Sequence, residues 1–137
     1  MPSGERGAIW APSRAAQLVD YRGLRWGNIT PTNVDGLIDF GARFFFFVEL
    51  KLRGAPFLLG QRLALANVRA AIVNGGKRCV VLVAEHTQHD PHEEIQAHAA
   101  EVIEILDGEV WRKPSRSVRV REAIDHYLRA SGHRRAA

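Results

Sequence analysis

Three charged residues lie in segments that otherwise look buried: Asp35, Glu49 and Lys51. Glu49 and Lys51 follow a run of four phenylalanines. Because side chains alternate along a strand, these two residues share a face with Phe45 and Phe47. A carboxylate and an ammonium group in a central strand cost several kcal/mol unless something compensates for their burial. We therefore expect a partner for them on a neighbouring strand.

Residues 41–43, Gly-Ala-Arg, are typical of a tight turn that joins this strand to the segment before it. A three-residue turn pairs Phe40 with Phe44. The same register sets Asp35 opposite Glu49, with Cβ atoms about 4.5–5.5 Å apart. Two carboxylates that close repel each other, so one is protonated unless a cation lies between them. A two-residue turn would shift the register by one and separate the pair.

Two acidic oxygen donors, completed by waters, suit a hard divalent cation such as Mg²⁺ or Mn²⁺. The backbone carbonyl of Leu50 is a further candidate ligand. Lys51, on the same face as Glu49, can reach an attacking water or a phosphate oxygen. A divalent cation lowers the pKa of bound water and stabilises the charge that grows on a phosphate. This set of residues therefore predicts hydrolysis of a phosphodiester.

The elements that position these residues follow from apolar periodicity and turn signals. Strands are predicted over residues 34–40, 44–52, 77–84, 102–106 and 110–112. Helices are predicted over residues 12–22, 60–73 and 118–130. The order α-β-β-α-β-β-β-α predicts an α/β fold with a mixed central sheet flanked by helices. The phenylalanine-rich strand is apolar on both faces, so we expect it at the centre of the sheet.

The C-terminal half carries its own signals. Asp107-Gly108 suits a two-residue hairpin turn, and Ser117 is a plausible N-cap of the last helix. We find no internal repeat and no low-complexity linker, which predicts a single domain over 1–137. The expected parts of this domain are a core over about 5–84, a hairpin and helix over 102–130 and a basic tail over 131–137.

Charge is distributed unevenly along the chain, whose net charge is +4. Residues 50–78 hold six basic and no acidic residues, and residues 79–111 hold eight acidic residues and no Lys or Arg. Residues 112–137 hold eight basic and two acidic residues. A two-signed surface of this kind offers its basic part to a polyanion. The expected nucleic-acid contacts are Arg62, Arg69, Lys77 and Arg78.

The segment Asn33-Val34-Asp35-Gly36, followed by Val48-Glu49-Leu50-Lys51, resembles the PD-(D/E)XK, or restriction-endonuclease-like, nuclease superfamily. The longer segment from Asn28 to Gly36 looks especially like small phage-type, Holliday-junction-resolvase-like members. The resemblance covers roughly residues 5–84 and implies a core of helix, β-meander, helix and strand. The implied site residues are Asp35 and Glu49 as metal ligands, Lys51 as the catalytic lysine and Gln61 as a residue near the site on the next helix. Many members also carry a glutamate on the first helix, for which Glu5 is the candidate additional ligand.

The function that the resemblance implies is a Mg²⁺-dependent DNA endonuclease that leaves a 5′-phosphate and a 3′-hydroxyl. The substrate stays open among a junction, a flap, a duplex, a single strand and RNA. A homodimer would bring two active sites to two strands. The implied location is the cytoplasm, with a phage or prophage in a bacterial host as a compatible origin.

Two alternatives remain at this point. One is a DNA-binding or assembly domain of the same fold without catalysis. The other is a zinc enzyme built on a histidine-rich segment, although solvated loop histidines explain that segment better, because the spacing of the candidate ligands is loose. The residues of this segment are His86, His89, His92 and His98, with Asp90, Glu93 and Glu94.

The single cysteine, Cys79, lies in an apolar run and predicts a reduced core thiol in an intracellular protein. No apolar stretch approaches the roughly 20 residues of a membrane span. The first residues lack the basic-then-apolar pattern of a signal peptide.

Overall fold

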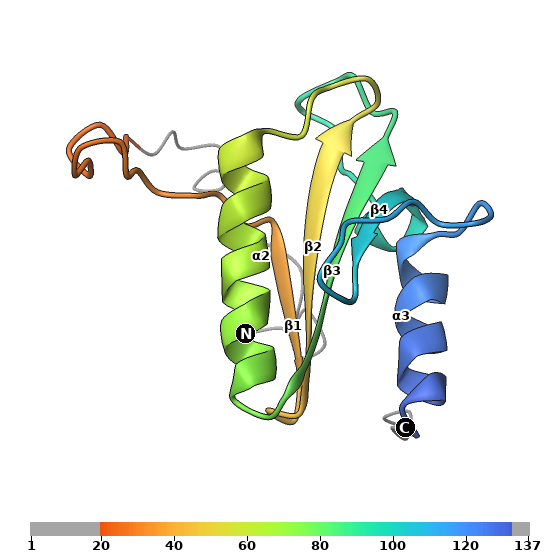
Figure 1. Cartoon of the computed structure of the whole chain (residues 1–137). Coiled ribbons are helices and arrows are strands. Elements are labelled where there is room, and N and C mark those ends of the chain that lie inside the picture. The colour runs from red at the N-terminus through yellow and green to blue at the C-terminus, as the bar shows by residue number, and fades with distance from the viewer. Residues whose placement is uncertain (1–19, 133–137) are drawn as a thin grey trace, which may run out of the picture. The chain divides into compact units, whose positions relative to one another are not determined.

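The computed structural model describes residues 20–132, and their elements form an α/β arrangement (Figure 1). The elements are β1 (Gly36–Phe40), β2 (Phe44–Leu52), α2 (Leu59–Asn74), β3 (Arg78–His86), the short 3₁₀ helix η1 (Ala97–Ala99), β4 (Glu101–Leu106) and α3 (Val120–Ala130). The predicted α/β class with a mixed sheet is therefore confirmed.

The chain divides into two compact units, one ending at Pro31 and the other beginning at Thr32. In the described part of the first unit, Trp26 and Ile29 form an isolated antiparallel bridge. The helix predicted over 12–22 lies mostly outside the described residues, and its last three residues are not helical. All the elements named above belong to the second unit.

The four strands of the described residues form one sheet in the order β1-β2-β3-β4. β2 runs antiparallel to β1 and parallel to β3, whereas β4 is antiparallel to β3. A parallel neighbour cannot be reached by a tight turn, so α2 carries the chain from β2 to β3 across one face of the sheet. β2 is a central strand, as its apolar faces predicted.

The β1–β2 hairpin has the predicted register. Phe40 pairs with Phe44 across the three-residue turn at 41–43. Continued one residue beyond the last pair of the ladder, this register sets Asp35 opposite Glu49. The tight turn thus determines which side chains meet at the far end of the hairpin.

Each face of the sheet has its own apolar core, and the two helices cover different faces. The core under α2 contains Phe47, Leu65, Cys79, Val81 and Leu106. The core under α3 contains Phe44, Phe46, Val48, Val80, Leu82, Val102, Ile105, Ile124 and Leu128, among others. Cys79 is a buried free thiol, as predicted. Because β4 and α3 belong to these cores, residues 102–130 are part of the main fold.

The segment after β4 differs from the prediction. Instead of a strand over 110–112, a single bridge joins Ile105 to Arg112. This pairing leaves six residues between the two partners, so the two-residue hairpin turn at Asp107-Gly108 was wrong. The reason is a competing use of Asp107, whose carboxylate binds Arg112 at 2.8 Å and Tyr127 at 2.6 Å.

The start of α3 also differs. Its N-cap is Arg119, whose backbone N–H is bonded by the Glu122 carboxylate at 3.2 Å. Ser117, the predicted cap, instead donates its hydroxyl to Glu101 at 3.2 Å. Among the described residues, no helix combines the length and the apolar character needed to cross a bilayer.

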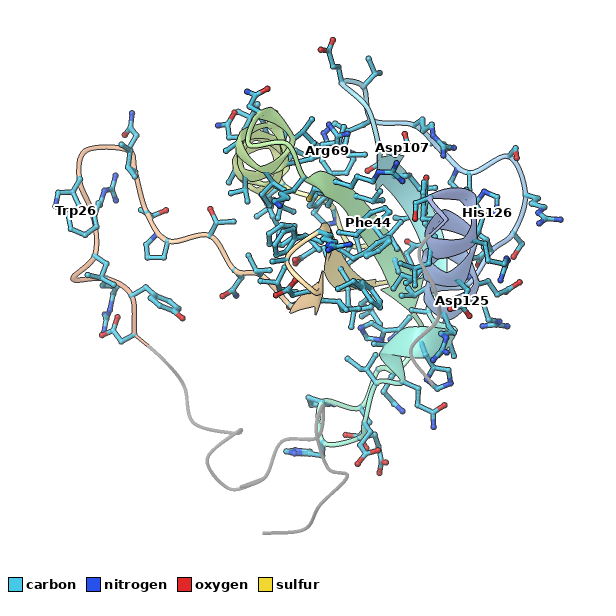
Figure 2. All side chains as sticks on the ribbon, turned by 90° about the horizontal axis from the view of Figure 1, so that it is seen from below. Trp26, Phe44, Arg69, Asp107, Asp125 and His126 are labelled. Carbon is cyan, nitrogen blue, oxygen red and sulfur yellow. The ribbon has the colours of Figure 1, made fainter. Side chains whose placement is uncertain are left out.

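Arg69 fastens α2 to the sheet. Its guanidinium donates to the backbone carbonyls of Cys79, Asp107 and Gly108 at 2.9, 2.7 and 2.8 Å. Figure 2 shows Arg69 directed toward the segment that carries Asp107. The guanidinium of this predicted nucleic-acid contact is therefore already bonded within the domain.

Candidate active site

Glu49 is a buried charged residue near the carboxyl end of β2, with 7% of its surface exposed. One of its carboxylate oxygens, Oε1, accepts a hydrogen bond from the Gln61 side chain. The other, Oε2, is buried and has no hydrogen-bond partner among the described residues. An unpartnered buried carboxylate oxygen is costly, so it marks a place where a proton or a cation would be stabilised.

Asp35 lies beside Glu49, just before β1. Its Oδ2 accepts a hydrogen bond from the backbone N–H of Leu50 at 2.7 Å, which fixes the carboxylate at this end of β2. Burial, followed by the nearby charge of Asp35, raises the pKa of Glu49 to about 7. The hydrogen bond from Gln61 acts in the opposite direction. Glu49 therefore holds a proton up to a higher pH than an exposed glutamate does.

Gln61 comes from the first turn of α2 and connects the two sides of the site. Its Nε2 donates to Glu49 and, at 3.4 Å, to the backbone carbonyl of Asn33. This second contact lies two residues before Asp35. Gln61 therefore holds one oxygen of Glu49 and leaves Oε2 directed elsewhere.

The donor set fits Mg²⁺ or Mn²⁺, because both acidic side chains offer oxygen and one oxygen is unsatisfied. Leu50, predicted to offer its carbonyl, contributes its N–H to Asp35. The described part of the chain contains no group of three or more Asp, Glu, His or Cys side chains placed to hold a metal. Glu5, the candidate additional ligand, lies outside the described residues.

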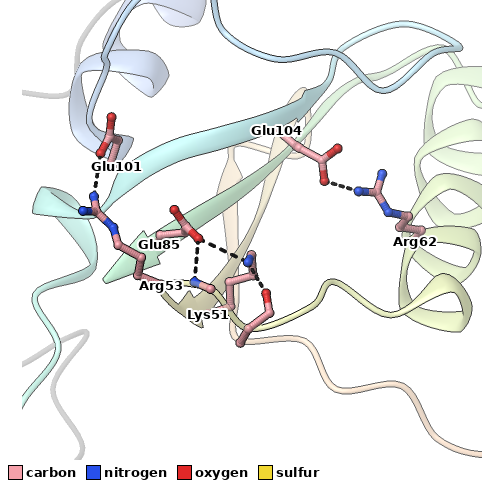
Figure 3. A network of polar contacts seen from close by, with 8 residues as sticks. Lys51, Arg53, Arg62, Glu85, Glu101 and Glu104 are labelled. Carbon is pink, nitrogen blue, oxygen red and sulfur yellow. Dashed lines mark hydrogen bonds and ion pairs between the residues drawn. The ribbon is translucent and has the colours of Figure 1, made fainter. Parts of the chain in front are cut away.

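Lys51 lies two residues beyond Glu49 and is 15% exposed in its side chain. Its ammonium donates to Glu85 at 3.3 Å and to the backbone carbonyl of Ala55 (Figure 3). Glu85 is its register partner on β3 and also accepts the N–H of Gly54 at 3.2 Å. Burial raises the pKa of Glu85, but the bonds from Gly54 and Lys51 outweigh it and lower that pKa overall.

The sequence interpretation missed Glu85. Its position in the apolar run of β3 was a signal, since it repeats the pattern of a charge at the end of a buried strand. Its pairing with Lys51 could not be read locally, because the parallel register between β2 and β3 is set across the α2 crossover.

Two more ion pairs continue the row of charges from Lys51 toward β4. Arg53 pairs with Glu101 at 3.2 Å, and Arg62 pairs with Glu104 (Figure 3). The Arg62 guanidinium also lies 4.8 Å from the centre of the Phe57 ring. This predicted nucleic-acid contact therefore has an acidic partner and an aromatic neighbour inside the domain.

Lys77 and Arg78 lie at the other end of β3 from the site. Arg78 begins the strand, and Glu85, the partner of Lys51, is seven residues further along it. At about 3.3 Å per residue this is roughly 23 Å. The structure brings together Asp35, Glu49 and Gln61, and Lys51 follows Glu49 by two residues on the same face of β2. It does not bring Lys77 and Arg78 to this group.

The histidine-rich segment connects β3 to η1. The ring nitrogen Nδ1 of His86 accepts the backbone N–H of Gln88 at 3.1 Å, and Asp90 accepts the N–H of His92 at 2.9 Å. These are local turn contacts. The histidines and acids of this segment are not gathered into a metal-binding group within residues 20–132.

No protein-family model, curated protein or solved structure matches this chain.

Proposed function

We propose that the protein is a divalent-cation-dependent deoxyribonuclease of the PD-(D/E)XK type. The observation that carries the proposal is the buried Glu49 carboxylate, whose Oε2 lacks a partner and whose neighbour is Asp35. Lys51 follows two residues later on the same strand. The strand-strand-helix-strand order of β1, β2, α2 and β3 supports the same assignment, since the resemblance implies this order around its site.

In this proposal Asp35 and Glu49 hold Mg²⁺ or Mn²⁺. The bound cation would supply a more acidic water and neutralise charge on the phosphate. Gln61 keeps Oε1 of Glu49 occupied, which leaves Oε2 for the cation. The Leu50 N–H keeps Asp35 turned toward Glu49.

Lys51 acts on the water or the phosphate in the proposed reaction. Its ammonium orients the attacking water or stabilises the charge on the phosphate, since it lies on the Glu49 side of β2. Glu85 and the Ala55 carbonyl restrict its freedom, so little conformational entropy is lost when substrate arrives. The cytoplasmic location, the phage or prophage origin and the homodimer remain predictions of the same resemblance.

Cleavage of a panel of labelled DNA tests the proposal. The panel contains single strands, duplexes, flaps and four-way junctions, each with Mg²⁺, with Mn²⁺ and with EDTA. We expect cleavage by the wild type with either cation, and a loss of about a hundredfold or more for Glu49→Gln and for Lys51→Ala. Glu109→Gln, a change at an exposed residue outside the site, is the matched control and should cleave normally. Equal activity in Lys51→Ala and the wild type would remove the assignment.

Cation binding gives a readout that does not depend on cleavage. Titration calorimetry with Mn²⁺ should detect binding to the wild type and a marked loss in Asp35→Asn and Glu49→Gln. Normal Mn²⁺ affinity in both variants would show that these carboxylates are not the ligands.

A DNA-binding domain without catalysis is the second candidate. It is favoured by the engagement of Lys51 with Glu85 and by the presence of only two acidic candidates at the described site. The same panel separates the two candidates, since this domain would shift the mobility of DNA but would cut none of the substrates with any cation.

A further inference from the structure

An open cleft of about 710 Å³ begins beside Lys51 and Glu85. Its lining includes Glu101 and Glu104 of β4, Arg62 of α2 and four residues of the loop after β4, namely Lys113, Pro114, Arg116 and Ser117. The volume is within the range of roughly 300–1,000 Å³ that is usual for ligand sites. The cleft thus extends from the proposed catalytic lysine, Lys51, to the basic loop after β4.

The acidic residues of the cleft are neutralised by neighbours. Glu85 pairs with Lys51 at 3.3 Å. Glu101 pairs with Arg53 at 3.2 Å, and Glu104 pairs with Arg62. The glutamates therefore leave little net negative charge that would repel a polyanion.

The basic residues of the loop, unlike the glutamates, have no ion-pair partners among the described residues. Lys113 and Arg116 are exposed, and neither has an ion pair or side-chain hydrogen bond to another described residue. The loop between Arg112 and Val118 is anchored at both ends, since Arg112 bonds to Ile105 and Val118 accepts the N–H of Val102 at 2.9 Å. The two anchored ends of the loop thus keep two cationic side chains without acidic partners at the edge of the cleft.

We infer that this cleft binds a nucleic-acid strand adjacent to the phosphate that is cut, with Lys113 and Arg116 contacting its backbone phosphates. The inference rests on the proposed nuclease function and adds where the substrate lies. Phosphate contacts of this type supply affinity and position without reading sequence. The cleft is therefore a surface for the sugar-phosphate backbone.

The alternative cations are less suitable. Arg62 and Arg69 have partners within the domain. Lys77 and Arg78 lie at the far end of β3, roughly 23 Å along the strand from the Lys51 register position. Their pair has the same composition as Lys113 and Arg116, one Lys and one Arg, and so provides a matched control.

The test measures binding of a fluorescein-labelled 20-nucleotide single-stranded DNA by anisotropy in EDTA, at several salt concentrations. EDTA separates binding from cleavage. We expect the double variant Lys113→Ala/Arg116→Ala to bind about tenfold more weakly than the wild type at low salt. We also expect the slope of log affinity against log salt to become less steep by about 1.4, because each single-strand phosphate contact contributes about 0.7. Lys77→Ala/Arg78→Ala should bind like the wild type.

The outcomes distinguish this inference from the nuclease assignment. Three results would each refute DNA binding in the cleft. The first is equal affinity in Lys113→Ala/Arg116→Ala and the wild type, and the second is an equal loss of affinity in the two double variants. The third is no binding by the wild type at low salt. If only Lys113→Ala/Arg116→Ala loses affinity while the wild-type protein cuts no DNA, the result would support DNA binding in the cleft and refute the nuclease assignment. Circular dichroism and the thermal midpoint check that both double variants are folded.

Discussion

Glu49 shows how one residue can be unfavourable for the metal-free fold and still define the site. Its raised pKa means that the folded chain keeps a proton that the unfolded chain releases near pH 4.5. Between about pH 4.5 and about 7 the folded state therefore binds more protons, and the free energy of unfolding falls as pH rises. Above that window Glu49 is ionised in both the folded and the unfolded chain, and in the folded chain its charge lies beside Asp35.

This argument predicts the pH dependence of Glu49→Gln in EDTA. The amide mimics the protonated acid, so the variant should lack the fall in stability and should exceed the wild type in thermal midpoint at pH 8. Differential scanning calorimetry across pH 4–8 measures both curves. Mn²⁺ should raise the midpoint of the wild type only. Parallel pH curves for the two proteins would contradict the raised pKa.

At Lys51 the prediction concerns positioning by Glu85. Removing the carboxylate in Glu85→Ala releases the ammonium from its strand partner, and we expect kcat to fall about tenfold or more with little change in KM. Glu85→Gln keeps an oxygen acceptor for Lys51 and for the Gly54 N–H, so it should retain more activity. Steady-state kinetics with Mg²⁺ compare the three proteins. Identical losses in both variants would argue against positioning through an acceptor.

At the scale of elements, the turn of the β1–β2 hairpin controls the site from its other end. Ala42 has a left-handed backbone with φ of 60°, and its N–H is bonded by the Asp39 carboxylate at 2.6 Å. A left-handed conformation costs a non-glycine residue roughly 1–2 kcal/mol. The Asp39 contact offsets part of that cost and so helps to fix a register that ends at Asp35 and Glu49.

We accordingly expect Asp39→Ala to lower the free energy of unfolding by about 1 kcal/mol. Asp39→Asn keeps the acceptor oxygen and should lose less. Urea denaturation followed by circular dichroism measures both values. A loss as large in the asparagine variant as in the alanine variant would place the role of Asp39 elsewhere.

The elements that were predictable are those whose signal is local. The run Phe44–Leu52 gave the central strand with its observed bounds, and the three-residue turn gave the register of the hairpin. The juxtaposition of Asp35 and Glu49 followed from that register alone. Local patterns were sufficient here because both strands and their turn are contiguous in the sequence.

The parts that could not be predicted depend on distant partners. Asp107-Gly108 has the composition of a tight turn, but Arg112 and Tyr127 bind the Asp107 side chain. Glu85 and Glu104 acquire their roles only through pairing across the sheet and with α2. Periodicity within one segment carries no information on such contacts.

At the scale of the whole sheet, the two faces have different tasks. The α3 face is apolar along β2, whereas the α2 face is apolar at one end and charged at the other. The network of Asp107, Arg112 and Tyr127 ties the segment after β4 to α3, which covers the apolar face. This network also sets the base of the loop that carries Lys113.

Tyr127→Phe tests how much this connection contributes to the whole fold. Burial, followed by the Asp107 carboxylate, raises the pKa of Tyr127 to about 12, so its hydroxyl remains a donor at any ordinary pH. Removing it deletes the bonds to Asp107 and Arg112, and we expect a loss of about 1–2 kcal/mol in the free energy of unfolding. Chemical denaturation measures the loss, with Tyr21→Phe, at an exposed residue, as the control. An unchanged midpoint would mean that the network is dispensable.

The single cysteine, Cys79, lies in the core under α2, so its reactivity reports how often this helix separates from the sheet. Burial raises the pKa of the Cys79 thiol to about 11, although nearby Arg69 lowers it somewhat, so a disulfide reagent meets an inert group until α2 lifts away. The rate of thiol modification then measures how often α2 separates from the sheet. Gln61, in the first turn of the same helix, bonds Glu49, so thiol modification should slow when a cation is bound between Glu49 and Asp35.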